Sequence, residues 1–118
     1  MLQEDLREMI DAGAAKFPAD IVICNGQLVN VNSAEIYQAD VAIYRSQIVA
    51  TGDVSEYIGP NTQRIDATGK YLVPGLIDGH LHIECSKLSM TSFAKAVVPH
   101  GTTSIISGLD QYVVTSGL

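Results

Sequence analysis

Basic residues are scarce in this chain of 118 amino acids. Lys and Arg together number 7 against 13 Asp and Glu, so the formal net charge is −6. A protein that binds nucleic acid neutralises phosphates with clustered Lys and Arg, and here the basic residues are scattered along the chain. The composition therefore excludes nucleic acid as an expected partner.

Long apolar runs are also missing. No stretch approaches the roughly 18 consecutive apolar residues that indicate a membrane span. The first ten residues, MLQEDLREMI, carry acidic side chains where a secretory signal peptide needs a positively charged region. We therefore expect a cytoplasmic protein that makes no membrane contact.

Cysteine is rare as well, and Cys24 and Cys85 lie far apart in the sequence. They form neither a CxxC pair nor the dense pattern of a disulfide-stapled domain, so we expect both to be reduced and buried. The chain also lacks the HxE and PCxxC motifs of the cytidine- and adenosine-type zinc deaminases. That architecture is excluded.

The length of the chain allows one ordinary domain or two incomplete ones, since domains usually run to roughly 100–200 residues. Hydrophobic residues make up 47% and charged residues 17%. Such a chain can bury a core and is not typical of a disordered protein. A large catalytic barrel cannot be complete within it.

A helix is predicted near the N-terminus, because apolar side chains follow the one-sided spacing of an amphipathic helix. These side chains are Leu2, Leu6, Met9 and Ile10. Pro18 then breaks the pattern, since proline disfavours the helical conformation of the residue before it. We interpret residues 1–19 as a helix and a linker.

Residues 20–71 have the pattern of β-structure. The runs DIVIC and QLVNV flank Asn25-Gly26, a dipeptide that readily takes the positive φ angles of a type I′ turn, so a hairpin is predicted there. Further short strands are predicted at residues 40–44, 47–50 and 63–66. Short strands at close intervals are typical of a small β-sandwich or an open β layer.

The pattern changes after residue 69. The apolar run of residues 71–77 is typical of a strand buried on both faces, and its second half predicts a parallel strand. A helix is predicted over residues 89–98, because its apolar residues have helical spacing and Ser89 or Thr91 is available as a cap. Another strand is predicted over residues 102–107. Strand, helix and strand in this order make the βαβ unit of an α/β fold.

The segment PGLIDGHLHIE, residues 74–84, holds the candidate chemistry. If residues 80–84 are extended, His80, His82 and Glu84 share one face of the strand, because side chains alternate with a period of two. Two imidazoles about 6.6 Å apart can lean toward one metal ion. The alternative is a pair of histidines on a polar strand face.

Other polar residues near this segment have less specific interpretations. Glu84 could orient a metal ligand, contact a substrate or bond a backbone amide, and Asp78 shares its parity but suits a structural hydrogen bond. His100 follows a proline at a predicted helix end, which favours a turn or capping role. Cys85 is interpreted as a packed thiol, because adjacent strand residues face opposite sides.

The segment VPGLIDGHLHIE and the later turn HGTT resemble the amidohydrolase superfamily, whose first barrel strand carries HxH after an apolar, Pro-Gly-containing lead. Within that superfamily, residues 72–106 most resemble adenine deaminases. The resemblance extends over about residues 20–106. It would cover only the N-terminal part of a typical family member.

This resemblance implies a small β-sandwich portion over residues 20–71, followed over residues 72–118 by the start of an incomplete (β/α)₈ barrel. It implies that His80 and His82 bind the first divalent metal, Mn, Fe or Zn, in a centre of one or two ions. Such an ion lowers the pKa of bound water, and a carboxylate manages the proton. The implied reaction is hydrolytic deamination of a purine base, adenine, to hypoxanthine and ammonia.

The chain departs from the adenine deaminase pattern after the second predicted strand. Adenine deaminases commonly carry Asp-Pro-His-Glu there, whereas this chain has Gly108-Leu109-Asp110-Gln111. Asp110 and Gln111 lie at the strand end where active sites of barrel enzymes form, so substrate contact and ordinary loop polarity both remain open. Another cyclic amide or amidine hydrolase of the superfamily is the alternative.

Family enzymes take their remaining metal ligands from later barrel strands, which this sequence does not contain. We therefore expect the chain alone to be inactive. Two parallel strands cannot close a barrel and leave apolar faces and strand edges open. The expected partners are the missing barrel part, a companion chain or further copies in an oligomer. A non-catalytic β module that binds a partner chain is the remaining alternative.

Overall fold

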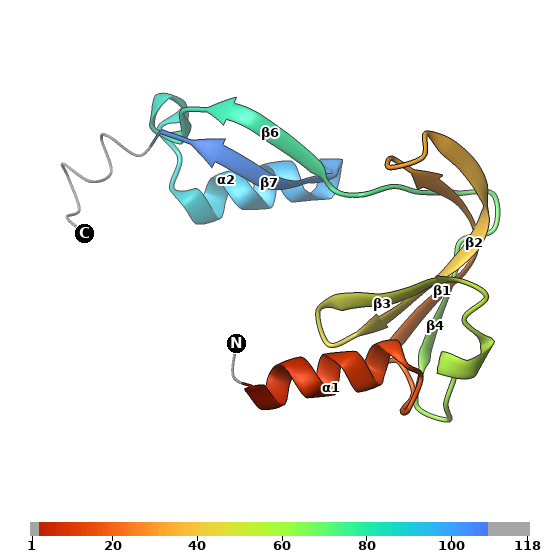
Figure 1. Cartoon of the computed structure of the whole chain (residues 1–118). Coiled ribbons are helices and arrows are strands. Elements are labelled where there is room, and N and C mark those ends of the chain that lie inside the picture. Colours follow the sequence, from red (N-terminus) through yellow and green to blue (C-terminus); the bar gives the residue numbers. More distant parts are fainter. Residues whose placement is uncertain (1–2, 109–118) are drawn as a thin grey trace. The chain divides into compact units, whose positions relative to one another are not determined.

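The structure is a computed structural model, and it describes residues 3–108. The chain divides into two compact units, the first ending at Val73 and the second beginning at Pro74. Figure 1 shows the elements of each unit. Within the described range, no helix has the length and apolar character to cross a membrane.

The described part of the first unit contains one α-helix, one short 3-10 helix and five strands. Helix α1 (Gln3–Gly13) is followed by β1 (Ile21–Asn30), β2 (Glu35–Tyr44), β3 (Gln47–Gly52), the short 3-10 helix η1 (Ser55–Tyr57), β4 (Gln63–Asp66) and β5 (Tyr71–Leu72). The strands form one sheet in the order β3-β2-β1-β4, and β5 also pairs with β1. Strand β2 is antiparallel to β1 and β3, whereas β4 and β5 run parallel to β1. The predicted β-rich first part is confirmed.

The predicted hairpin at Asn25-Gly26 is wrong. Strand β1 continues through both residues, and its register against β2 shifts between Ile23 and Gly26. Asn25 does take a positive φ of 65°, but it uses this conformation in a β-bulge, which adds one unpaired residue to a strand. The backbone N–H of Asn25 donates to Oδ1 of Asp40 at 2.8 Å, which gives the bulge a partner outside the ladder.

The core of the first unit lies around the centre of β1 and β2. Ala19, Val22, Ala42 and Val54 are buried together, and Tyr57 and Ile58 pack against them. Helix α1 contributes the buried Ala12, whereas Leu6 and Ile10 on the same helix are exposed. The amphipathic spacing therefore predicted the helix, but part of its apolar face lies open.

The second unit is a βαβ arrangement. It comprises β6 (Leu76–Leu81), the 3-10 helix η2 (Ile83–Ser86), α2 (Met90–Val97), the 3-10 helix η3 (Val98–His100) and β7 (Thr102–Ser107). Strands β6 and β7 are parallel. Ser89 caps α2 by accepting a hydrogen bond from the Ser92 backbone N–H at 3.2 Å. The α/β class is confirmed, and the described residues form the strands and helix of one βαβ unit without a closed barrel.

Two local expectations for the second unit are wrong. The chain is not extended from residue 80 to residue 84, because β6 ends at Leu81 and a 3-10 helix begins at Ile83. Ile83 turns inward and is almost fully buried, which accounts for the end of the strand. Cys85 is exposed, so the expected packed thiol is wrong there. Both cysteines are free, as expected, and the half-buried Cys24 packs against the core of the first unit.

Gly26 permits the close approach of β5 to β1. A Cβ atom at Gly26 would lie 2.5 Å from Cγ of Leu72. We expect Gly26→Ala to lower the free energy of unfolding by about 1–3 kcal/mol through overpacking. The same substitution in a Leu72→Ala background should cost less, because the atom it strikes is gone. Urea unfolding of the unmodified chain, the two single variants and the double variant measures this coupling, and purely additive effects would contradict it.

Candidate metal centre

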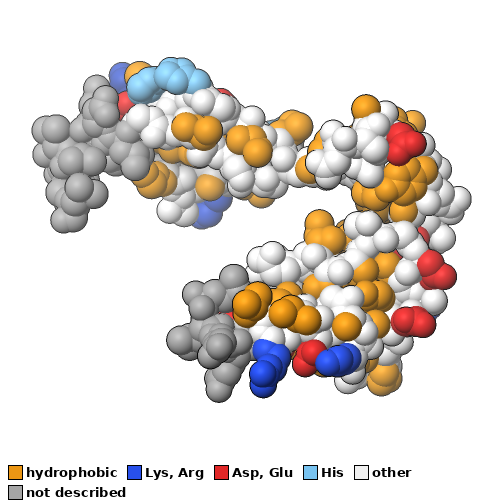
Figure 2. Space-filling view, in the orientation of Figure 1, with side chains coloured by type: hydrophobic (Ala, Val, Ile, Leu, Met, Phe, Trp, Pro, Cys, Tyr) orange, Lys and Arg blue, Asp and Glu red, His pale blue; other side chains and the backbone are white. Residues whose placement is uncertain are grey.

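Two imidazoles come together at the C-terminal end of β6. His80 is the next-to-last residue of the strand, and His82 follows it with an extended backbone, φ −120° and ψ 94°. Their ring centroids are 5.0 Å apart with an interplanar angle of 78°. Figure 2 shows histidine side chains at the surface of the second unit. The period-two alternation thus places both rings on one side, as the sequence predicts.

Glu84 reaches His82 from the 3-10 helix that follows the strand. Its Oε1 lies 3.0 Å from Nδ1 of His82. The side chain of Glu84 is 11% exposed and that of His82 is 41% exposed. The pKa of the Glu84 carboxyl is lowered, first by its own backbone N–H and also by the hydrogen bond and charge of His82, against desolvation, which raises it. Glu84 therefore joins the histidine pair as a carboxylate.

The second oxygen of this carboxylate has no protein partner among residues 3–108. Oε2 of Glu84 is buried and makes no hydrogen bond there. A buried carboxylate oxygen without a donor costs free energy, because it loses water and gains nothing in return. The oxygen is thus open to a donor or cation from outside the described residues.

Backbone approaches at two glycines fix how β6 and β7 meet. A Cβ at Gly108, just after β7, would lie 2.9 Å from Cε1 of His82, and a Cβ at Gly75 would lie 2.0 Å from Oγ1 of Thr103. Only a residue without a side chain allows these contacts. Gly79, between Asp78 and His80, faces open space, with no atom within 4 Å of its Cβ position.

The other candidates separate into distinct environments. Oδ1 of Asp78 accepts a hydrogen bond from the backbone N–H of His80 at 3.1 Å, which is the structural role considered from sequence. His100 ends η3, two residues before the start of β7, whereas His80 and His82 lie near the other end of the strand pair. Cys85 lies exposed in η2. Asp110 and Gln111 lie outside the described residues.

The histidine pair is an incomplete metal site on its own. Across the described part of the chain, no group of three or more His, Cys, Asp or Glu side chains is arranged to hold a metal ion. Structural zinc sites use four protein ligands and catalytic ones usually three. The two imidazoles, with the Glu84 carboxylate at Nδ1 of His82, therefore form part of a metal centre at most.

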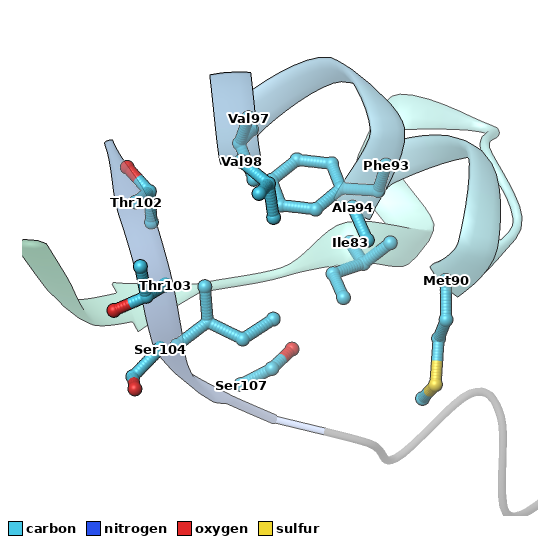
Figure 3. Close-up of a pocket in the computed structure, with 11 residues that line it drawn as sticks. Ile83, Met90, Phe93, Ala94, Val97, Val98, Thr102, Thr103, Ser104 and Ser107 are labelled. Atoms are coloured by element: carbon cyan, nitrogen blue, oxygen red, sulfur yellow. The ribbon is translucent and has the colours of Figure 1, made fainter. Parts of the chain in front are cut away.

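An apolar cavity of about 420 Å³ lies between α2 and β7. Figure 3 shows Phe93 and Val97 of α2 and Val98 of η3 on one side of the cavity, with strand β7, which carries Thr103 and Ser104, on the other and Ile83 nearby. The helical spacing predicted the apolar face of α2 but not the open space beneath it. Its lining residues include no acid, base or histidine, so the cavity is separate from the metal chemistry.

Comparisons with known proteins place this geometry in a family context. No protein-family model matches the chain. It is 65% identical over 114 residues to adenine deaminase 4 of Rhizobium meliloti, covering 96% of this chain and 19% of the relative. It is 67% identical over 113 residues to adenine deaminase 1 of Latilactobacillus sakei, again covering 19% of the relative. The chain thus spans about a fifth of the length of the curated relatives it matches.

Solved structures agree with the sequence comparison. A D-aminoacylase described as defining a subset of amidohydrolases matches with a TM-score of 0.65 and 30% identity, over 77% of this chain and 19% of that one. A D-hydantoinase from Thermus sp. matches with a TM-score of 0.57 and 31% identity, over 74% of this chain and 20% of that one. D-aminoacylase is also described with a binuclear metal centre.

The fold corresponds to the N-terminal part of enzymes of the amidohydrolase superfamily. Within that superfamily, the sequence corresponds to the N-terminal part of adenine deaminases. Both resemblances drawn from the sequence are confirmed.

Gly75, just before β6, and Gly79, within β6, supply a matched test of how the strand that carries His80 is held against β7. Gly75→Ala should lower the free energy of unfolding by about 1–3 kcal/mol, because its Cβ would strike Thr103. Gly79→Ala, with open space around it, should cause no loss. Thermal unfolding compares the two, and Thr103→Ala should lessen the Gly75→Ala effect. Equal losses at both glycines would contradict the proposed contact.

Proposed function

We propose that this chain supplies the N-terminal part of an adenine deaminase, including the first two metal ligands, His80 and His82. The observation that carries the proposal is the pair of imidazoles at the end of β6, within a sequence 65% identical to the N-terminal part of a curated adenine deaminase. The reaction is then the hydrolytic deamination of adenine to hypoxanthine and ammonia. A cytoplasmic location and assembly into an oligomer are parts of the same proposal.

The donor set fits a divalent transition metal. Imidazole nitrogens bind Zn, Mn and Fe ions, and the His82 ring is partly open to solvent while its Nδ1 faces a carboxylate. When bound, such an ion would activate water for attack at neutral pH. His80 and His82 hold the ion, and residues from outside the described range complete the centre. Mn, Fe and Zn are the metals we propose.

Several features of the proposal concern residues beyond the pair. Asp110 is proposed as a substrate contact, because it follows β7 at the strand end where barrel enzymes bind their substrates. The proposed division of the chain is also part of the proposal. It places the helix and linker before residue 20, the β-sandwich portion over residues 20–71 and the start of the barrel from residue 72. The isolated chain is proposed to be inactive, because its two ligands form only part of a centre.

A second candidate is a different cyclic amide hydrolase of the superfamily. The similarity of fold to a D-hydantoinase favours it, as does the departure at Asp110 and Gln111 from the adenine deaminase pattern. The two candidates share the metal pair and differ in substrate. Assays with adenine and with a hydantoin separate them.

A chimeric enzyme tests the proposed reaction. This chain replaces the matching N-terminal part of Rhizobium meliloti adenine deaminase 4, and the release of ammonia from adenine is measured. We expect an active chimera, in which His80→Ala or His82→Ala lowers kcat by about 100-fold or more through loss of metal chemistry. His100→Ala is the matched control and should leave the rate unchanged. Wild-type turnover by the double variant lacking His80 and His82 would remove the metal assignment.

Metal binding by the chain itself gives a readout without turnover. We expect Zn²⁺ to perturb the ring signals of His80 and His82 together in an NMR titration, with weak affinity, because two imidazoles make an incomplete site. The ring of His100 should stay unperturbed. Tight, stoichiometric binding by the monomeric chain would contradict the proposal that further ligands come from elsewhere.

A further inference from the structure

We propose that Glu84 is a positioning residue that fixes the proton of His82 on Nδ1 and so leaves Nε2 as the metal-binding nitrogen. The inference rests on the proposed function in naming the metal. The assignment of the proton stands on the contact itself, Oε1 of Glu84 to Nδ1 of His82 at 3.0 Å.

The chemistry of the two groups allows one arrangement. A neutral imidazole carries one proton, on either ring nitrogen, and the other nitrogen holds a lone pair. An ionised carboxylate can only accept a hydrogen bond. Nδ1 of His82 must therefore donate to Glu84, and the lone pair available for a cation lies on Nε2. Carboxylate partners of this kind commonly orient metal-bound histidines and raise their basicity.

The 3-10 helix η2 places Glu84 beside the ring of His82. Ile83 is only 2% exposed and anchors the turn. The Ser86 hydroxyl donates to the Ile83 carbonyl at 2.5 Å, and the Lys87 N–H donates to the Glu84 carbonyl at 3.1 Å. An extended chain would carry position 84 onward along the strand direction, whereas the turn folds it back toward the ring of His82.

The backbone after β7 supports the ring of His82 at a second point. The Cβ position of Gly108 lies 2.9 Å from Cε1 and 3.2 Å from Nδ1 of His82. Any side chain at residue 108 would force the ring to move, and with it the bond to Glu84. The ring is thus fixed by a hydrogen bond to Glu84 and by steric contact at Gly108.

The decisive measurement is the tautomer of His82 in the metal-free full chain. Long-range ¹H–¹⁵N NMR distinguishes the two neutral forms, at a pH about two units above the ordinary histidine pKa of about 6.5. We expect the Nδ1–H form at His82. An Nε2–H form in the unmodified chain would overturn the inference, and this result requires no variant to fold.

Variants connect the tautomer to Glu84. Glu84→Ala should shift His82 away from the Nδ1–H form while the signals of His100 stay in place. Glu56→Ala is the matched control, because Glu56 is an exposed acid in the 3-10 helix η1 of the first unit. It should leave His82 unchanged. A tautomer at His82 that is insensitive to Glu84→Ala would also overturn the inference.

Metal affinity separates this inference from the proposed function. In the chimeric enzyme, Glu84→Ala should weaken Zn²⁺ binding by about 10–100-fold, the usual effect of removing the partner of a metal-bound histidine. Unchanged affinity would overturn the positioning role and leave the metal pair intact. If His82 shows the expected tautomer and Zn²⁺ perturbs neither histidine ring, the proposed function fails instead.

Discussion

The parallel hydrogen bonding of β6 and β7 is the constraint on which the candidate centre depends. It aligns the ends of the two strands, with Leu81 opposite Ser107. This register brings Gly108 against the ring of His82. Since the side chains of a strand alternate, the same register also fixes which face His80 presents. A shift of one residue would carry the imidazoles to the other face.

Strand β6 and the 3-10 helix η2 supply different groups to the candidate centre. The strand end offers paired imidazoles with accessible nitrogens. The turn offers a carboxylate whose pKa is held low, mainly through its own backbone N–H, so that it stays charged beside His82. Its partnerless oxygen and the missing third ligand both indicate that chemistry needs groups beyond residues 3–108. The similarity to one fifth of an adenine deaminase agrees with this incompleteness.

Sequence patterns predicted what depends on neighbouring residues. The Ser89 cap, the apolar spacing of α2 and the alternation that groups His80 with His82 are all local signals, and each is present in the structure. Asn25 shows the limit of such signals. Its positive φ was predicted, but its bonds to Asp40 and Asp66, far along the chain, place it in a bulge instead of a hairpin turn.

The contacts that refine the site are likewise long-range or depend on burial. No local pattern indicates that residue 108 would press against residue 82, or that burial of Ile83 would end the strand three residues before Glu84. Alternation alone put Glu84 on the histidine face through a longer strand. In the structure the 3-10 helix η2 brings Glu84 to His82 instead, and Oε2 of Glu84 has no hydrogen-bond partner among the described residues.

The distribution of buried apolar residues has a consequence for local unfolding. Ile83 is the one hydrophobic residue of the described second unit that is fully buried, whereas the first unit buries Val22, Ala42, Val54 and several others. The protection of a backbone amide from hydrogen exchange rises with the free energy of opening the structure around it. Amides of β6 and β7 should therefore exchange with solvent sooner than those of β1 and β2.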